Sequence, residues 1–155
     1  MKSRILVIEQ TPDISDVMRI YLEHYYYIAF SPSNTDAIHK IEKDKHIKLV
    51  IYNHNPPEMD GIEFLKGIRK QHILTPFILA SDDIDDKPEV EIIKNTLFIE
   101  EPIKIDPLIQ IIEVLVPKDY PKEKERRQFP RVKINKEALV FSETKKKEIS
   151  GEVIN

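Results

Sequence analysis

The chain has 155 residues, of which 41% are hydrophobic and 33% are charged, a composition typical of a globular protein and not of a disordered or fibrous one. It contains no cysteine, which excludes disulfides, thiolate zinc sites and cysteine nucleophiles. The formal net charge is −3, and the acidic excess of residues 1–117 argues against nucleic-acid binding, because it repels phosphate backbones.

Five short apolar runs rich in β-branched residues predict strands that are buried on both faces. They are residues 5–8, 27–30, 49–52, 77–80 and 97–99. Amphipathic segments with helical periodicity follow each of them. The predicted helices cover residues 14–25, a segment around 37–41 capped by Ser33 or Asn34, residues 62–68 capped by Asp60, a short helix over 88–95, and a last helix that opens at Asp106 or Pro107 and runs to Leu115.

The alternation of strand and helix predicts an α/β fold with a parallel sheet, because parallel strands need crossover connections. With five strands, the flavodoxin-like, doubly wound order 2-1-3-4-5 is the simplest choice. The carboxyl ends of strands one, three, four and five then gather around one crevice. The residues expected there are Glu9, Gln10, Asn53, Ser81, Glu100 and Glu101.

Neither a membrane span nor a signal peptide is predicted. The longest apolar stretch, residues 105–116, is interrupted by Asp106, Gln110 and Glu113 and is too short to cross a bilayer. Residues 1–8 lack a small-residue cleavage site and a long apolar core. We therefore expect a cytoplasmic protein.

Asn53 stands at the end of the third predicted strand, where α/β sheets place their ligand chemistry. A neutral amide forms hydrogen bonds but cannot serve as a phosphate-accepting nucleophile. The sequence has no glycine-rich phosphate loop, no nucleophile beside a base and no metal-ligand spacing, so we assign no catalytic residue and no metal site. A hydrolase that uses the crevice acids has little support.

Four segments resemble the receiver domain of two-component response regulators, over about residues 3–117. They are residues 5–12, 57–61, 75–81 and 98–102. The resemblance places the family's cation-binding acid pair on Glu9 and Gln10, its phosphate-accepting Asp on Asn53, its hydroxyl residue on Ser81, its phosphate-binding Lys on Glu101 and its aromatic switch residue on Phe98. Only Ser81 and Phe98 keep the chemistry that the family expects.

The other substitutions imply a receiver that is not phosphorylated at the usual site. Gln10 and Asn53 offer amides where Mg²⁺ prefers carboxylates, so we expect weak or absent Mg²⁺ binding. Glu101 repels a phosphoryl group, at a cost on the order of 4 kcal/mol for like charges about 4 Å apart and an effective dielectric near 20. The fold and the crevice would then serve protein contacts.

Structural interpretations remain open for the same residues. Asn53 can cap a strand end, Ser81 can satisfy loop amides, and Phe98 can be ordinary core. If Glu9 faces Glu101, the two acids share a proton, point to solvent or attract a basic group. We expect His54, next to Asn53, to be a solvated loop histidine.

The end of the chain differs in charge and composition. Residues 1–117 carry 13 Lys and Arg against 20 Asp and Glu, whereas residues 118–155 carry 11 against 7. We predict a linker over residues 118–125 and a second, incomplete domain over residues 126–155, with two strands at residues 131–141 and 147–154. These two strands are too few to close a barrel, so we expect the chain to be a fragment of a longer protein.

This last segment resembles the opening of a PilZ domain, a β-barrel whose family binds cyclic di-GMP. The resemblance rests on the Arg-rich run that starts at Arg126 and on residues 150–155. It implies a ligand site at Arg126, Arg127 and Arg131, with Asn155 opening a second motif. Cyclic di-GMP is then the expected ligand of the parent protein.

We therefore predict a non-enzymatic bacterial signalling protein, in which a degenerate receiver docks partners or dimerises for a PilZ-type effector. The family analogy puts a homodimer contact on the face from the fourth to the fifth helix. The alternative is a switch that is phosphorylated at another acid, such as Asp60 or one within residues 82–86, or that responds to a partner without phosphate.

Overall fold

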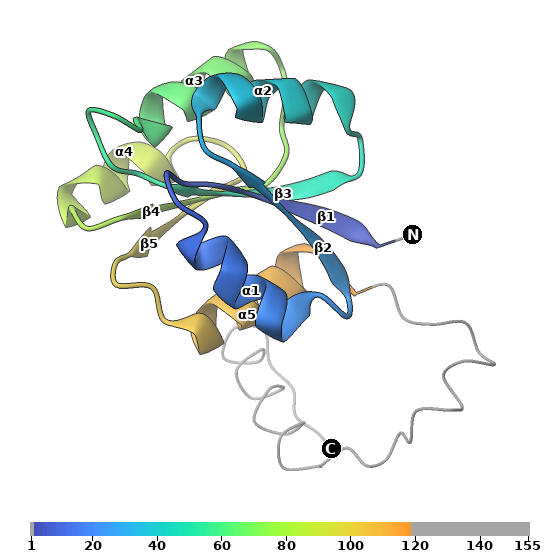
Figure 1. The fold of residues 1–155 in the computed structure, drawn as a ribbon. Coiled ribbons are helices and arrows are strands. Elements are labelled where there is room, and N and C mark those ends of the chain that lie inside the picture. The colour runs from blue at the N-terminus through green and yellow to red at the C-terminus, as the bar shows by residue number, and fades with distance from the viewer. Residues whose placement is uncertain (1, 119–155) are drawn as a thin grey trace, which may run out of the picture. The chain divides into compact units, whose positions relative to one another are not determined.

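The computed structural model describes residues 2–118 of the chain, and Figure 1 shows their arrangement. Over these residues the chain alternates five parallel strands with helices. The strands are β1 (Ser3–Ile8), β2 (Tyr26–Ser31), β3 (Ile47–Asn53), β4 (Phe77–Ser81) and β5 (Thr96–Glu100). The helices are α1 (Asp13–Leu22), α2 (Asn34–Lys43), α3 (Gly61–Lys70), α4 (Lys87–Glu91) and α5 (Ile105–Leu115), with a 3-10 turn, η1 (Ile84–Asp86), before α4.

The strands form one sheet in the order β2-β1-β3-β4-β5, and every neighbouring pair is parallel. The predicted flavodoxin-like, doubly wound fold is therefore confirmed for the described residues. The predicted PilZ-type strands, the linker and the four ligand residues Arg126, Arg127, Arg131 and Asn155 lie outside them.

Two cores fill the space between the sheet and its helices. One face of the sheet is covered by α2, α3 and α4, where Leu65, Ile68 and Val90 are buried. The other face is covered by α1 and α5, where Met18, Leu108 and Ile112 are buried. Because helices cover both faces of the sheet, side chains on both sides of the strands are mostly buried, and the strand sequences are continuous apolar runs instead of alternating ones.

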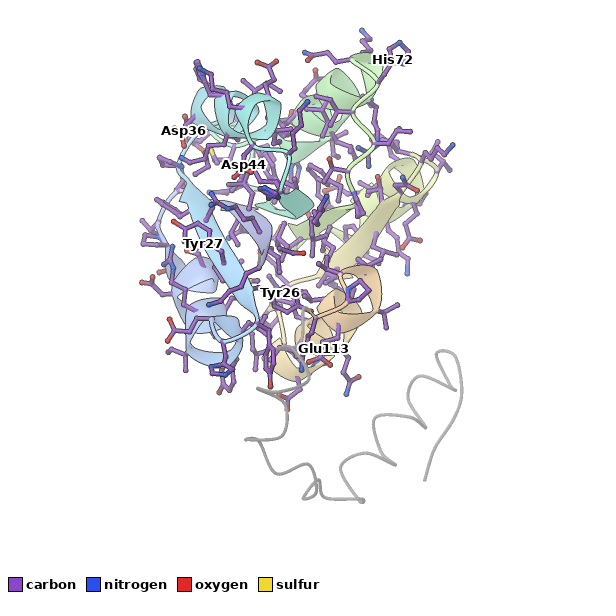
Figure 2. The ribbon with its side chains drawn as sticks, turned by 90° about the vertical axis from the view of Figure 1, so that its right-hand side faces the viewer. Tyr26, Tyr27, Asp36, Asp44, His72 and Glu113 are labelled. Carbon is purple, nitrogen blue, oxygen red and sulfur yellow. The ribbon has the colours of Figure 1, made fainter. Side chains whose placement is uncertain are left out.

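The edge strand β2 uses adjacent tyrosines in opposite ways (Figure 2). Tyr26 is fully buried and donates a hydrogen bond to the carbonyl oxygen of Val116 over 2.5 Å, which joins the edge strand to the end of α5. Tyr27 is half-exposed and lies under the guanidinium group of Arg4, 4.7 Å from its ring centroid. The cation and the ring cover part of the exposed edge.

The helix starts follow local capping chemistry where a capping side chain is present. Ser33 accepts the N–H of Asp36 at the start of α2, and Asp60 accepts the N–H groups of Ile62 and Glu63 at the start of α3. Of the two predicted caps for α2, Ser33 is therefore the observed one, and the Asp60 cap is confirmed.

Three helix boundaries were predicted wrongly. The first helix was expected to run to Tyr25, but α1 ends at Leu22. The fourth helix was expected over residues 88–95, but α4 ends at Glu91 and the chain then turns through Asn95, whose φ of 58° cannot continue a right-handed helix. The last helix begins at Ile105, before Asp106 and Pro107, with Lys104 at the cap position and no side-chain cap. No helix within residues 2–118 has the length and apolar character needed to span a bilayer.

Gly61 is required where α3 meets the sheet, and Gly67 in the same helix serves as its control. A Cβ atom at Gly61 would lie 2.6 Å from Cδ1 of Tyr52 and 2.9 Å from Cδ1 of Leu79, whereas a Cβ atom at Gly67 would meet nothing within 4 Å. We expect Gly61→Ala to lower the free energy of unfolding by about 1–3 kcal/mol through overpacking. Gly67→Ala should raise it by about 0.5–1 kcal/mol, because Gly weakens a helix interior.

Urea unfolding followed by far-UV circular dichroism measures both changes. If Gly61→Ala were as stable as the unchanged protein, the close approach of α3 to β3 and β4 would not constrain the fold.

Candidate functional site

The carboxyl ends of four strands meet at one edge of the sheet, as predicted from the sequence. Asn53 ends β3 and pairs in register with Ala80, one residue before Ser81 at the end of β4. Ser81 in turn pairs with Glu100 on β5, and Glu9 directly follows β1. The predicted site residues therefore share one region of the molecule, although their side chains take different directions.

Glu9 is directed at the first turn of α1. Its side chain is buried, and its two carboxylate oxygens accept the backbone N–H groups of Ile14, over 3.0 Å, and Ser15, over 2.8 Å. Burial raises the pKa of Glu9, while the two amide hydrogen bonds oppose this shift. The carboxylate satisfies N–H groups that the helix itself leaves unpaired and lies at the positive end of its dipole.

Glu9 and Glu101 therefore do not form the acid pair that the sequence left open. Both oxygens of Glu9 are engaged by α1, and Glu9 does not line the pocket that contains Glu101. Sequence spacing placed the two acids at one edge of the sheet but left the direction of each side chain open. Hydrogen bonds from the otherwise unpaired N–H groups of α1 decide where the Glu9 side chain points.

Gln10 and Asn53, the two amides at the predicted cation site, contact different groups. The exposed Gln10 side chain accepts a hydrogen bond from Nδ2 of Asn55 through Oε1, over 3.1 Å. Asn53 is partly buried and lines a pocket with Glu101. Within residues 2–118, no three His, Asp or Glu side chains lie in an arrangement that could hold a metal ion.

Ser81 is buried and is tied to the turn that follows β4. Its Oγ donates to Oδ2 of Asp86 over 2.8 Å and accepts the N–H of Asp83 over 3.0 Å. The hydroxyl group thus holds η1 against the end of the strand. This agrees with the interpretation of Ser81 as a hydroxyl that satisfies loop amides.

His54 is buried, so the expectation of a solvated loop histidine is wrong. Its Nδ1 accepts the N–H of Gly61 over 2.9 Å, and its Nε2 lies 3.6 Å from Oδ2 of Asp86. The first contact puts the proton of the neutral ring on Nε2, which faces the Asp86 carboxylate. The ring therefore connects β3, the start of α3 and η1.

Sequence reasoning missed His54 because the strand signal stops at Asn53. The backbone N–H of His54 donates to the carbonyl oxygen of Ala80 over 2.8 Å and so extends the β3 to β4 pairing by one residue.

Phe98 is 9% exposed and belongs to the core under α2, α3 and α4. Its interpretation as core is confirmed.

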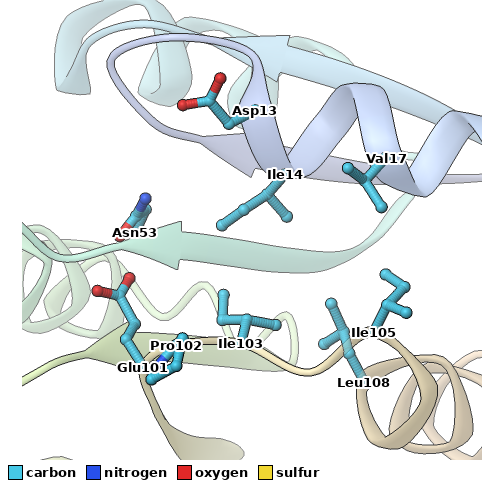
Figure 3. A pocket seen from close by; sticks show the side chains of 9 residues that line it. All are labelled: Asp13, Ile14, Val17, Asn53, Glu101, Pro102, Ile103, Ile105 and Leu108. Atoms are coloured by element: carbon cyan, nitrogen blue, oxygen red, sulfur yellow. The ribbon is translucent and has the colours of Figure 1, made fainter.

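A pocket of about 300 Å³ opens between α1 and α5 at the same edge of the sheet (Figure 3). Its walls are aliphatic, with Ile14 and Val17 from α1, Ile103 from the loop after β5, and Ile105 and Leu108 from α5. Its polar groups are Asn53, Glu101 and Asp13.

The polar end of the pocket is electrostatically negative. Burial raises the pKa of Glu101, and the nearby Asp82 adds to the shift. Asp13 accepts a hydrogen bond from Oγ1 of Thr11 over 2.8 Å, and Asn53 is neutral. The described residues that line the pocket include no Lys or Arg, so the arrangement attracts cations and repels anions.

Comparison with known proteins extends the sequence resemblance. Residues 5–113 match the family model of the response regulator receiver domain. The transcriptional regulatory protein YxdJ of Bacillus subtilis is 26% identical over 120 residues, which cover 76% of this chain and 52% of that protein. The chain thus spans about half the length of this curated relative.

Solved structures agree with the fold. The chemotaxis response regulator CheY4 of Vibrio cholerae is 20% identical with a TM-score of 0.63, and the match covers 75% of this chain and all of that one. The receiver domain of the Francisella response regulator 1452 is 24% identical with a TM-score of 0.64, over 74% of this chain and 96% of that one. At this identity the likeness concerns the fold alone.

The cap made by Glu9 can be tested by removing it. We expect Glu9→Ala to lower the free energy of unfolding by about 1–3 kcal/mol, because one buried and one partly buried N–H group of α1 lose their acceptor. Thermal or urea unfolding with millimolar Mg²⁺ and with a chelator measures this loss. A structural cap gives the same loss in both buffers.

Asp16→Ala is the matched control, because Asp16 lies in the same first turn but is exposed, with its carboxylate paired to Arg19. Its effect should stay below about 1 kcal/mol, as for other surface ion pairs. A Glu9→Ala loss that appears only with Mg²⁺ would show that Glu9 holds the cation instead of α1.

Proposed function

We propose that this chain, which belongs to the response regulator receiver domain family over residues 5–113, signals without phosphorylation at the end of β3. In this proposal it is a non-enzymatic module of a bacterial two-component system, and its surface is read by protein partners. Asn53 and Glu101, side by side in one acidic pocket, carry the proposal.

The chemistry of this pair opposes phosphate. An amide at position 53 offers no carboxylate to accept a phosphoryl group. Glu101 stands in the same pocket with a half-buried carboxyl that already lies near Asp82. An incoming phosphate would add negative charge to a place where negative charge is already disfavoured.

The same reasoning leads us to propose that Mg²⁺ does not bind at the usual position. Mg²⁺ requires nearly octahedral oxygen ligands and favours carboxylates. The Glu9 carboxylate is occupied by two amides of α1, and Gln10 and Asn53 supply neutral amides only. These donors do not fit the cation.

A receiver that uses another acid is the alternative, and three of its five candidate acceptors already accept local hydrogen bonds. Asp60 caps α3, Asp83 caps η1, and Asp86 accepts the hydroxyl of Ser81. A phosphoryl group on any of them would first break these local hydrogen bonds. We therefore favour the phosphate-independent proposal.

For the partner surface, we propose the face from α4 to α5, where this chain would dimerise or dock another protein. Exposed apolar side chains support this choice. Ile92 after α4 is 83% exposed, Leu97 on β5 is 37% exposed and Val114 on α5 is 49% exposed. Apolar side chains left in solvent on adjacent elements favour a protein contact.

We also propose that the segment after residue 125 begins a PilZ-type effector that binds cyclic di-GMP. Its support is the sequence pattern of Arg126, Arg127 and Arg131 together with the positive charge of residues 118–155. Arginine offers planar, bidentate donors that suit phosphate oxygens and stack on purine rings. Cyclic di-GMP would then supply the input signal, in place of phosphorylation of the receiver.

The absence of phosphorylation is the first expected outcome. Incubation with acetyl phosphate and Mg²⁺ should leave the intact mass of the protein unchanged, because the acceptor carboxylate is missing. A triple variant, Gln10→Asp with Asn53→Asp and Glu101→Lys, should gain one phosphoryl group under the same conditions.

Asn53→Asp alone is the informative intermediate. Since Glu101 still opposes the phosphate, it should gain much less than the triple variant. A stable acyl phosphate on the unchanged protein would overturn the proposal, and Mg²⁺-dependent binding of beryllofluoride would favour the alternative acceptor.

The messenger proposal has a separate test. Isothermal titration of the natural full-length protein with cyclic di-GMP should give heat of binding, and Arg127→Ala should remove it. Lys122→Ala removes the same charge within the predicted linker and should leave the heat unchanged. The absence of heat with the unchanged protein would end the cyclic di-GMP proposal and leave the receiver proposal standing.

A further inference from the structure

We infer that the pocket between α1 and α5 is a binding site for a small organic cation, in which an ammonium or guanidinium group is carried on an apolar body. This goes beyond the proposed function, because it assigns a ligand to the receiver domain itself. It does not depend on the PilZ proposal.

The acidic end of the pocket selects the charge of the ligand. Figure 3 shows the Glu101 carboxylate pointing toward the Asn53 side chain at one end of the pocket. Among residues 2–118, no hydrogen-bond donor or cation pairs with the carboxylate of Glu101, and Asp82 lies near enough to disfavour its charge. A ligand ammonium would supply the missing counter-charge, and the oxygen of Asn53 could accept a second N–H.

The aliphatic walls select the body of the ligand. Ile14 and Val17 face Ile103 and Leu108 across the pocket, so an apolar group between them would be removed from water on both sides. The same walls lower the local dielectric, which strengthens attraction at the acidic end. Apolar walls with a few convergent polar groups are typical of small-molecule sites.

The size of the pocket favours a free molecule over a protein side chain. Its volume of about 300 Å³ lies at the lower end of the range for ligand sites. A partner's lysine presents the same ammonium, but its flexible four-carbon stem leaves most of the aliphatic wall uncovered. Anions, including phosphate, are repelled by Glu101 and Asp13, and a neutral ligand would leave Glu101 without a counter-charge.

Phenethylamine is a suitable probe, because it combines a primary ammonium with an aromatic body. Its matched controls are phenethyl alcohol, which is neutral, and phenylpropionate, which is anionic. We expect the amine to shift the backbone amide signals of Ile14, Ile103 and Leu108 in ¹H–¹⁵N correlation spectra. Phenylpropionate should cause no saturable shift at these positions, and phenethyl alcohol should bind about tenfold more weakly than the amine.

The decisive variant is Glu101→Gln, which keeps the shape of the side chain and removes its charge. It should weaken phenethylamine binding about tenfold. Glu42→Gln is the control, since Glu42 is exposed on α2, on the opposite face of the sheet, and changes the net charge equally. Its Kd should equal that of the unchanged protein.

A second variant keeps the test decisive if Glu101→Gln does not fold. Val17 is 41% exposed on α1, so Val17→Lys is a surface change that tethers an ammonium beside the pocket. It should compete with the probe and weaken its binding, whereas Ile20→Lys, which adds the same ammonium at an exposed position of α1 outside the pocket, should not.

Several outcomes would overturn the inference. They are equal binding of phenylpropionate, a Kd that neither Glu101→Gln nor Val17→Lys changes, and shifts that map to another surface. Tighter binding of Nα-acetyl-lysine methylamide than of phenethylamine would show that the pocket binds a lysine side chain of a partner protein and not a free small molecule. The mass assay for phosphorylation is independent of all of these results.

Discussion

The buried carboxylate of Glu9 holds the first turn of α1 against the end of β1, and the site depends on this contact. A helix leaves its first N–H groups without partners, and here two of them donate to the carboxylate of the residue that directly follows β1. The contact fixes where α1 begins and how it approaches the sheet. Ile14 and Val17 therefore form one wall of the pocket, while α5 forms the other.

The same contact removes Glu9 from the chemistry that its position suggests. Withdrawing this carboxylate would leave one buried and one partly buried N–H group unpaired, at a cost of about 1–3 kcal/mol. Glu101 becomes the principal charge of the crevice, with Asp82 beside it and an amide at position 53. In our proposal the residues at positions 10, 53 and 101 act together, because two neutral amides and a carboxylate suit a cation better than a phosphate.

A second group of contacts ties the remaining strand ends together. His54 links the end of β3 to the start of α3 through Gly61, and its other nitrogen faces Asp86. Asp86 in turn accepts the hydroxyl of Ser81 at the end of β4. Strand β3, helix α3 and η1 are therefore connected through polar groups that are mostly buried. Such a connection stabilises the shape of the crevice.

The sequence by itself determined the alternation of elements, the order of the strands and the edge at which the polar residues gather. Apolar runs, helical periodicity and the Asp60 cap are local signals, and the right-handed crossover rule converts them into a sheet. The receiver family could also be recognised from the sequence.

Only the tertiary structure decided where the side chains at that edge point. The Glu9 carboxylate accepts N–H groups of α1, and His54 is buried against the start of α3. Helix α4 ends at Glu91, and the chain turns at Asn95. The pocket combines residues from positions 13 to 108. These outcomes depend on which partners satisfy each polar group once distant segments meet, and a pattern of neighbouring residues does not contain that information.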